Sequence, residues 1–322
     1  MRRHHWLLLC ALLVLTAGAS VLLPATGLFE LARRDPGLVS TILIEIRLPR
    51  MTAGMFYGAI LGASGAAIQA LFANPLASPD ITGATGGAAL GAVITAYILG
   101  FAGPLALAAG GTVGALLALL LLLGLAGRQG DSATFLLAGI AISALTGAAT
   151  ALALALAPSP FAFYEAYDWL MGSLVDRSLL QAMMVALPSI IALILLVRDS
   201  AALDSLALGE AAAEAMGHHL PALRKRIIVT SAFGVGTAVA VCGAVGFIGL
   251  VAPIFARRLT AAHPGRAILP AALIGAILLG LADLIVRLAP AGRPLPVGVI
   301  TALLGAPFFL ALVGRMRTEL RG

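Results

Sequence analysis

The sequence has few charged residues, two cysteines and no cluster of metal-binding side chains. Asp, Glu, Lys and Arg make up 11% of the 322 residues, whereas soluble domains contain about 25%. Cys10 and Cys242 lie in separate apolar runs, so we expect neither a disulfide nor a metal site. No phosphate loop of the G-x-x-x-x-G-K-[ST] type occurs, and His, Asp and Glu are scattered. We therefore expect no ATP hydrolysis and no cofactor in this chain, and a membrane-embedded enzyme is disfavoured.

Hydrophobic residues dominate what is present. They form 61% of the chain, the mean hydropathy is +1.07, and long apolar runs recur from end to end. The formal net charge of +6 would suggest nucleic-acid binding in a soluble protein. Here the basic residues flank the apolar runs, as the orientation of membrane helices requires. We predict an all-α polytopic membrane protein with one transmembrane domain over residues 1–322 and no nucleic-acid partner.

A membrane-spanning helix needs about 20 mostly apolar residues. The sequence predicts ten spans, at 6–24, 51–72, 82–101, 103–126, 133–157, 178–197, 226–242, 245–261, 268–288 and 297–314. The first could instead be a signal peptide, because Arg2 and Arg3 precede its apolar core. We favour an uncleaved helix that ends near Pro24, because the apolar run is long for a signal peptide.

Basic residues set the predicted orientation. The stretches 224–226 and 257–266 are both basic, so both should face the cytoplasm with an even number of helices between them. We therefore expect two short helices between them, joined by a tight turn near 242–246. Ten spans place both termini in the cytoplasm, with most of the 20 Lys and Arg residues on that side.

Small residues and leucines indicate how the helices are used. The stretches 58–67 and 114–127 place Gly and Ala at helix-packing spacing, which lets helices approach closely in lipid. The Leu-rich run 116–123 should face the lipid. We expect a tightly packed bundle with an apolar outer surface.

The segment after the second predicted span breaks the helical pattern. Asn74, Pro75, Pro79 and Asp80 end one helix and delay the next, because proline lacks a donor and restricts the residue before it. Such a break is either a plain cytoplasmic loop or part of a gate. Gln69, a polar residue inside the second span, favours the gate, since intramembrane polar groups usually face the bundle interior.

Two further motifs lie near the C-terminus. In LADLIVR, Asp283 and Arg287 are four residues apart on one helix face and can pair. In LPVGVITALLGAPFFLAL, Pro296 should open a helix that residues 305–307 interrupt.

An ordered set of motifs gives the chain a family resemblance. These motifs are RLPR at 47–50, NPLASPD at 74–80, WLMGS at 169–173, ALGEAAAEAMG at 207–217, GFIGLVAP at 246–253, LPAALIGA at 269–276 followed by LAD, and LPVGVITALLGAPFF at 295–309. Over about residues 40–315 the sequence resembles FecCD-type permeases, the membrane subunits of ATP-binding-cassette (ABC) importers for iron–siderophore complexes, haem and vitamin B12. That fold has ten transmembrane helices. One departure is Ile254, where the family often has His.

The resemblance implies an ATPase-coupling loop at about 199–224. Gly209 and Gly217 bracket a short Ala-rich helix that carries Glu210 and Glu214, and Gly217 can stop it in a left-handed conformation. Such a helix has strong propensity but little bulk for a core, so we expect it to dock in a groove of the ATPase subunit. A solvated loop is the alternative.

The resemblance also implies a docking surface for a periplasmic substrate-binding protein. Arg47, Arg50 and Arg287 match the positions that receive its carboxylates. Ordinary interfacial arginines that snorkel to lipid headgroups are the alternative.

The predicted pathway or gate comprises eight residues: Gln69, Asn74, Pro75, Pro79, Asp80, Trp169, Gly172 and Ser173. Trp169 could contact cargo, or it could be an aromatic residue at the membrane interface.

We thus expect a multi-pass permease of the bacterial inner membrane that imports an iron–siderophore by alternating access, with haem and vitamin B12 as alternatives. The expected partners are two ATPase subunits that hold ATP and magnesium, a periplasmic binding protein, membrane lipid, and a second permease, identical or paralogous. An ion-coupled secondary transporter is the rival from another class; its membrane carboxylates would be Asp80 and Asp283.

Overall fold

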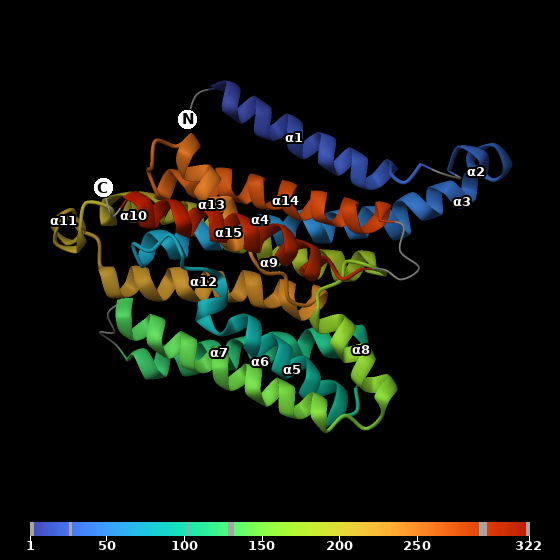
Figure 1. The fold of residues 1–322 in the computed structure, drawn as a ribbon, viewed down its shortest axis with the longest axis horizontal. Coiled ribbons are helices and arrows are strands. Elements are labelled where there is room, and N and C mark those ends of the chain that lie inside the picture. The colour runs from blue at the N-terminus through green and yellow to red at the C-terminus, as the bar shows by residue number, and fades with distance from the viewer. Residues whose placement is uncertain (1–2, 26–27, 102, 128–131, 290–294, 320–322) are drawn as a thin grey trace.

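The computed structural model describes residues 3–25, 28–101, 103–127, 132–289 and 295–319, and every regular element in these ranges is a helix. The elements form one elongated bundle (Figure 1). In chain order they are α1 (Arg3–Leu22), α2 (Leu28–Arg34), α3 (Pro36–Thr41), η1 (Ile42–Arg47), α4 (Leu48–Leu71), η2 (Pro79–Thr82), α5 (Ala84–Tyr97), α6 (Pro104–Ala126), α7 (Ser132–Ala155), α8 (Pro160–Leu170), α9 (Leu179–Arg198), α10 (Ser200–Leu206), α11 (Glu210–Ala215), α12 (Leu220–Cys242), α13 (Ile248–Leu259), η3 (Gly265–Ala267), α14 (Ile268–Leu288) and α15 (Val297–Glu319).

Each predicted span coincides with a helix, and the prediction of a multi-pass, all-helical protein is confirmed. Within the described residues, 7 helical segments are long and apolar enough to cross a membrane. Helices α5, α13 and the described apolar part of α15 are shorter than that. The start of α1 and the end of α15 lie at the end of the bundle that carries α10 and α11 (Figure 1). The count of ten spans and a cytoplasmic location for this end stay predictions.

Three details differ from the sequence-based expectations. Helix α12 begins at Leu220 rather than 226 and has 23 residues, so it is not short. Pro221 occupies its first turn, where a missing donor costs nothing, and the His219 Nδ1 accepts from the Ala222 amide. Helix α15 runs without interruption through Pro307. Helix α8 was not foreseen, because 11 residues are too few to span a bilayer.

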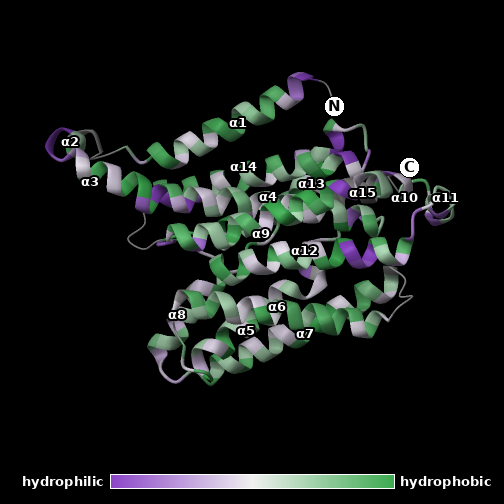
Figure 2. Cartoon of the chain, turned by 180° about the vertical axis from the view of Figure 1, so that it is seen from behind, coloured by the Kyte–Doolittle hydropathy of each residue, from purple (hydrophilic) through white to green (hydrophobic). Residues whose placement is uncertain are grey.

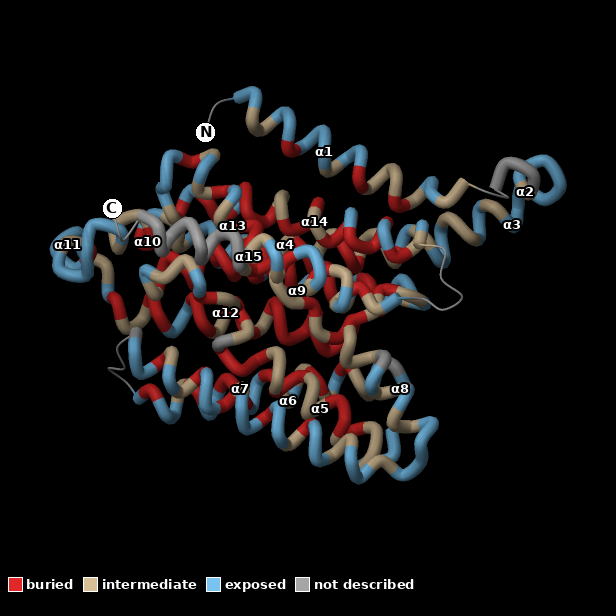
Figure 3. Tube along the Cα trace, in the orientation of Figure 1, coloured by how far each residue is buried: buried red, intermediate tan, exposed pale blue. Residues whose placement is uncertain are grey.

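Helix α4 lies at the centre of the bundle and packs against α14, α9, α13 and α12 (Figure 3). Its Gly58, Gly62 and Gly65 lie directly on the backbones of α14 and α13, where an added Cβ would overlap a carbonyl oxygen. The predicted packing role of 58–67 is therefore confirmed: these helices touch backbone to backbone.

Polar residues gather at the two ends of the bundle, and apolar residues cover its length (Figure 2). Helix α6 shows both faces of this pattern. Gly114 packs against the backbone of Gly87, whereas a Cβ added to Gly124 would meet no other helix within 4 Å. Leu117 and Leu120 are 60% and 63% exposed, but Leu119 and Leu122 are buried, so only one face of the predicted lipid-facing run 116–123 lies at the surface.

Candidate functional site

The loop between α9 and α12 forms a compact hairpin of two short helices, α10 and α11, that projects from one end of the bundle (Figure 1). Leu203 and Ala213 are fully buried and anchor the hairpin. The outer surface of α11 is exposed, and Leu208 and Met216, which flank the helix, are 73% and 51% exposed. The hairpin thus presents two apolar side chains at this end of the bundle.

Helix α11 ends in the left-handed stop that the sequence predicts. Gly217 has φ +86°. Its amide donates to the Glu214 carbonyl at 2.9 Å, and the His218 amide donates to the Ala213 carbonyl at 3.1 Å. These two bonds form a Schellman motif, which satisfies the last carbonyls of the helix.

Ion pairs connect this hairpin to α12. The Glu210 carboxylate pairs with Arg224, and both oxygens of Asp199 accept from Arg226, at 2.7 and 3.1 Å. Glu210 therefore points back to its own chain, whereas Glu214 is exposed and has no partner among the described residues. The two glutamates, four residues apart on one helix, therefore have different environments.

The hairpin also contacts the turn before α14. The Asp204 Oδ1 accepts from the Gly265 amide at 2.8 Å, and Arg266 lies 3.9 Å from the same carboxylate. A displacement of α10 would thus reach both α12 and α14.

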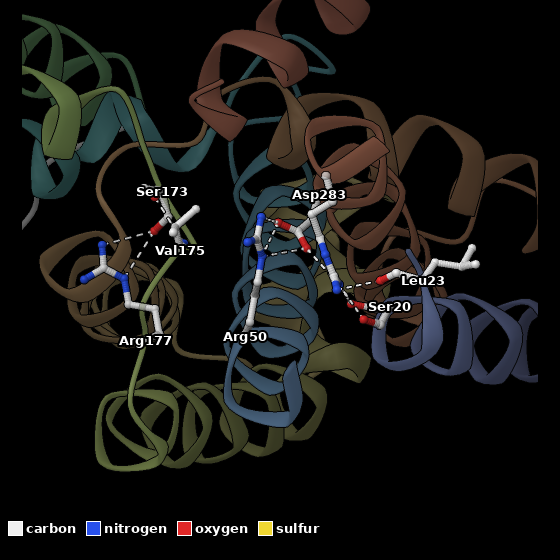
Figure 4. A network of polar contacts seen from close by, with 8 residues as sticks. Ser20, Leu23, Arg50, Ser173, Val175, Arg177 and Asp283 are labelled. Atoms are coloured by element: carbon white, nitrogen blue, oxygen red, sulfur yellow. Dashed lines mark hydrogen bonds and ion pairs between the residues drawn. The ribbon is translucent and has the colours of Figure 1, made fainter. Parts of the chain in front are cut away.

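At the opposite end of the bundle, Arg50, Asp283 and Arg287 form a buried cluster (Figure 4). Arg50 binds the Asp283 carboxylate through two nitrogens, at 2.7 and 2.9 Å, and the two side chains are 14% and 4% exposed. The predicted pair of Asp283 and Arg287 is present but longer, at 4.0 Å. The dominant partner comes from a position 233 residues away, which the sequence did not indicate.

Two arginines at this end, Arg287 and Arg47, donate hydrogen bonds to backbone carbonyls at the end of α1. Arg287 donates to the carbonyls of Ser20 and Leu23 (Figure 4). Arg47 donates to the carbonyls of Val21 and Pro24 at 2.8 and 2.9 Å. All three predicted docking arginines therefore have acceptors inside this chain. The geometry places them together at one end, and a docking role stays a prediction.

The predicted break between α4 and α5 is present and packs against two other helices. Gln69 is fully buried and donates to the Leu250 carbonyl of α13 at 3.2 Å. The Asn74 Oδ1 accepts from the Leu76 amide, which closes the turn. The Asp80 carboxylate accepts from Thr85, and its carbonyl accepts from Ser143 of α7. The break thus lies where α4, α7 and α13 meet.

Three other positions of the predicted gate, two prolines and a tryptophan, have defined surroundings. Pro79 is buried and packs against Gly249 of α13, while Pro75 is half-buried in the turn. Trp169 lies near the end of α8 and is half-buried.

Gly172 and Ser173 belong to a junction of three backbone segments. The Ser173 amide donates to the Cys242 carbonyl at 2.8 Å, and the Gly172 carbonyl accepts from the Val297 amide at 3.0 Å. Sequence reasoning missed Tyr57, whose fully buried hydroxyl donates to the Gly243 carbonyl at 2.9 Å and accepts from the Val245 amide at 3.1 Å. A tyrosine inside a Gly- and Ala-rich span was the available signal.

Comparisons with known proteins agree with this architecture. The model of the FecCD transport family matches residues 6–315. The vitamin B12 import system permease protein BtuC of Salmonella typhimurium is 40% identical over 319 residues, which cover 97% of this chain and 95% of that protein. BtuC of Vibrio cholerae is 39% identical over 291 residues, which cover 86% of this chain and 84% of that protein.

A solved structure shows the same fold. It is an inward-facing conformation of a metal-chelate type ABC transporter, with a TM-score of 0.84 and 28% identity, and the match covers 95% of this chain and 97% of that one. Together with the family match over almost the whole sequence, this likeness places the all-helical architecture in one family. The chain belongs to the FecCD transport family and is a membrane permease of the ABC-importer type.

Proposed function

We propose that this permease imports a corrinoid, vitamin B12 or a close analogue. The observation that carries the proposal is its 40% identity, over 97% of its length, to permeases named for vitamin B12 import. The default cargo expected from the sequence was an iron–siderophore, chosen on the breadth of the family alone. The relatives favour the alternative, and the metal-chelate type neighbour at 28% identity is consistent with both cargoes.

In this proposal, α11 and its flanks are the contact with a separate ATPase subunit. Three features support it: the exposed Leu208 and Met216, the small side chains of α11, and the ion pairs that tie the hairpin to α12. Small side chains allow a helix to enter a groove closely, and the ion pairs would transmit its displacement. ATP and magnesium would then be held by the ATPase and not by this chain.

The arginine cluster at the opposite end would receive carboxylates of a periplasmic binding protein. A carboxylate docked on Arg50 or Arg287 competes with Asp283 and with the α1 carbonyls. Because the Arg50 and Arg287 side chains are only 14% and 9% exposed, docking would require these internal contacts to open. A second copy or a paralogous permease would complete the central pathway.

The break between α4 and α5 and the junction at Gly172 are proposed as hinges of alternating access. Gln69 is buried on a backbone carbonyl, so it would act through α13 rather than by touching cargo. The relative positions of α4, α7 and α13 would change at this break, which contains Asn74, Pro75, Pro79 and Asp80. Ser173 and Trp169 would serve the same role at the other end.

The test is uptake into proteoliposomes that contain this permease with the ATPase and binding protein encoded beside it. We expect ATP-dependent uptake of labelled cyanocobalamin, and stimulation of ATP hydrolysis by cobalamin-loaded binding protein. Ferric siderophore and haem are the parallel cargoes. Uptake of either one without cobalamin uptake would overturn the cargo and keep the importer. Uptake driven by an ion gradient without ATP would overturn the ABC mechanism.

A further inference from the structure

A groove runs along the outside of the bundle between α6 and α9, with α12 as its floor. Both α6 and α9 pack against α12. The groove has a volume of about 310 Å³ and an apolar lining, whose residues are Thr112, Leu180, Met183, Met184, Leu187, Pro188, Thr237 and Val241. Leu180 and Leu187 are 58% and 53% exposed, so the groove opens to the surface of the span.

A second hollow adjoins this groove at the end of the bundle opposite α11. It has a volume of about 280 Å³, and Val241 lines both hollows. Tyr97, Trp169, Arg177 and Gln181 bring polar groups to its wall. An arginine and two aromatic rings at the mouth of an apolar groove are typical of the level of lipid headgroups.

The Arg177 guanidinium has donors to spare. Its Nε and Nη2 both donate to the Ser173 carbonyl, at 3.3 and 3.2 Å (Figure 4). A guanidinium carries five N–H donors in a fork that suits a phosphate. No described carboxylate forms an ion pair with Arg177. Gln181 is held in place beside it, because its Oε1 accepts from the Ser178 amide at 3.0 Å.

We propose that these two hollows, which share Val241, form one specific phospholipid site, with the phosphodiester on Arg177 and one acyl chain in the groove between α6 and α9. Arg177 lies two residues before α9 begins at Leu179, so its height matches the headgroups when α9 spans the bilayer. An empty apolar groove would lack dispersion contacts along its lining. Lipid acyl chains surround this surface in the bilayer, so one of them is the natural occupant. A phospholipid matches both features at once: its phosphate suits Arg177, and its acyl chain suits the apolar groove. A protein partner would have to supply both a negative charge and an apolar segment at this spacing.

This proposal is independent of the cargo. A lipid held against α8, α9 and α12 would touch the junction at Ser173, which Arg177 also contacts. The Arg177 guanidinium attracts net negative charge. We expect an acidic phospholipid to bind more tightly than a zwitterionic one, because the zwitterionic headgroup also carries a positive charge.

Native mass spectrometry of the detergent-purified chain with dioleoylphosphatidylglycerol tests the site. We expect one tightly retained lipid per wild-type chain. Arg177→Gln should weaken binding roughly ten-fold or more, the usual value of a charge-assisted hydrogen bond, while Arg177→Lys keeps most of it. Thr112→Phe should fill the groove and expel the lipid while leaving Arg177 in place.

Matched controls separate the site from general lipid affinity. Leu120→Phe adds an aromatic ring to the exposed face of the same helix, and Arg266→Gln removes a 70% exposed arginine at the other end. Both should retain lipid like wild type. If Arg177→Gln and Thr112→Phe retain the lipid as well as wild type does, in folded protein of wild-type melting temperature, the proposal is overturned. Retention of dioleoylglycerol, which lacks the phosphate, at the level of the phospholipid would overturn it as well.

Discussion

The stop of α11 at Gly217 gives the sharpest test of the hairpin, because backbone conformation and side-chain bulk can be separated there. Gly217 has φ +86°, and a Cβ added to it meets nothing within 4 Å. Space is therefore not limiting, and only the left-handed conformation matters. Alanine in that conformation costs about 1–2 kcal/mol. Asparagine is larger but tolerates it better.

Proline at this position cannot adopt the observed φ at all. It also removes the amide that donates to Glu214 and displaces the turn that sets the bond from His218 to Ala213. Each bond contributes about 1 kcal/mol. Helix α11 has 6 residues, and helices this short are marginal without their caps. We expect Gly217→Pro to unravel α11 and leave the bundle intact.

The assay is hydrogen–deuterium exchange over residues 209–219, together with ATP hydrolysis stimulated by loaded binding protein. Protection and stimulation should fall in the order wild type, Gly217→Asn, Gly217→Ala, Gly217→Pro, with uptake abolished in Gly217→Pro. If Gly217→Asn behaves like Gly217→Pro, bulk rather than φ is decisive and the reasoning fails. Full stimulation and uptake with α11 unprotected would refute its role as the ATPase contact.

Three further predictions concern the bundle itself. Asp283→Ala leaves the buried guanidinium of Arg50 without its carboxylate and should lower unfolding stability by about 3–5 kcal/mol; the double change Asp283→Leu with Arg50→Met should recover part of this in SDS titrations, and no loss in the single variant would contradict it. Tyr57→Phe leaves two buried backbone groups without a partner and should cost about 1–3 kcal/mol, measured as a lower melting temperature; an unchanged melting temperature would show that the hydroxyl is dispensable. Gly62→Leu should abolish the yield of monodisperse protein, because its side chain would overlap the α14 backbone, whereas Gly124→Leu, with open space around it, should not; equal yields would argue against the backbone contact.

The sequence predicted the helices well because bilayer thickness fixes their length and composition. Its errors have specific causes. Basic residues at 224–226 suggested a helix end, yet they lie inside α12, which starts at Leu220; Pro221 in its first turn was the better signal. Pro307 suggested an interruption, but α15 continues through it. Proline is tolerated in membrane helices when neighbouring groups satisfy the freed carbonyl.

The candidate site was predictable only where it is local. The left-handed stop at Gly217 follows from a short Ala-rich run that ends in glycine, and the structure has it. The pairing of Arg50 with Asp283 joins positions 233 residues apart, and no periodicity in one sequence encodes such a contact. The carbonyl acceptors of Arg47 and Arg287 could not be predicted either, because every residue has a carbonyl and the sequence does not mark which ones accept.

The glycines of α4 have a consequence for the entropy of assembly. In water, a glycine inside a helix costs about 0.5–1 kcal/mol relative to alanine, because an unfolded glycine has more backbone freedom to lose. In a bilayer, unpaired backbone groups are so costly that a span is helical before it meets its neighbours. The backbone freedom of Gly58, Gly62 and Gly65 is therefore lost at insertion and not again when α4 meets α13 and α14. Glycine has no side-chain rotamers to freeze, so this contact forms with almost no further loss of conformational entropy.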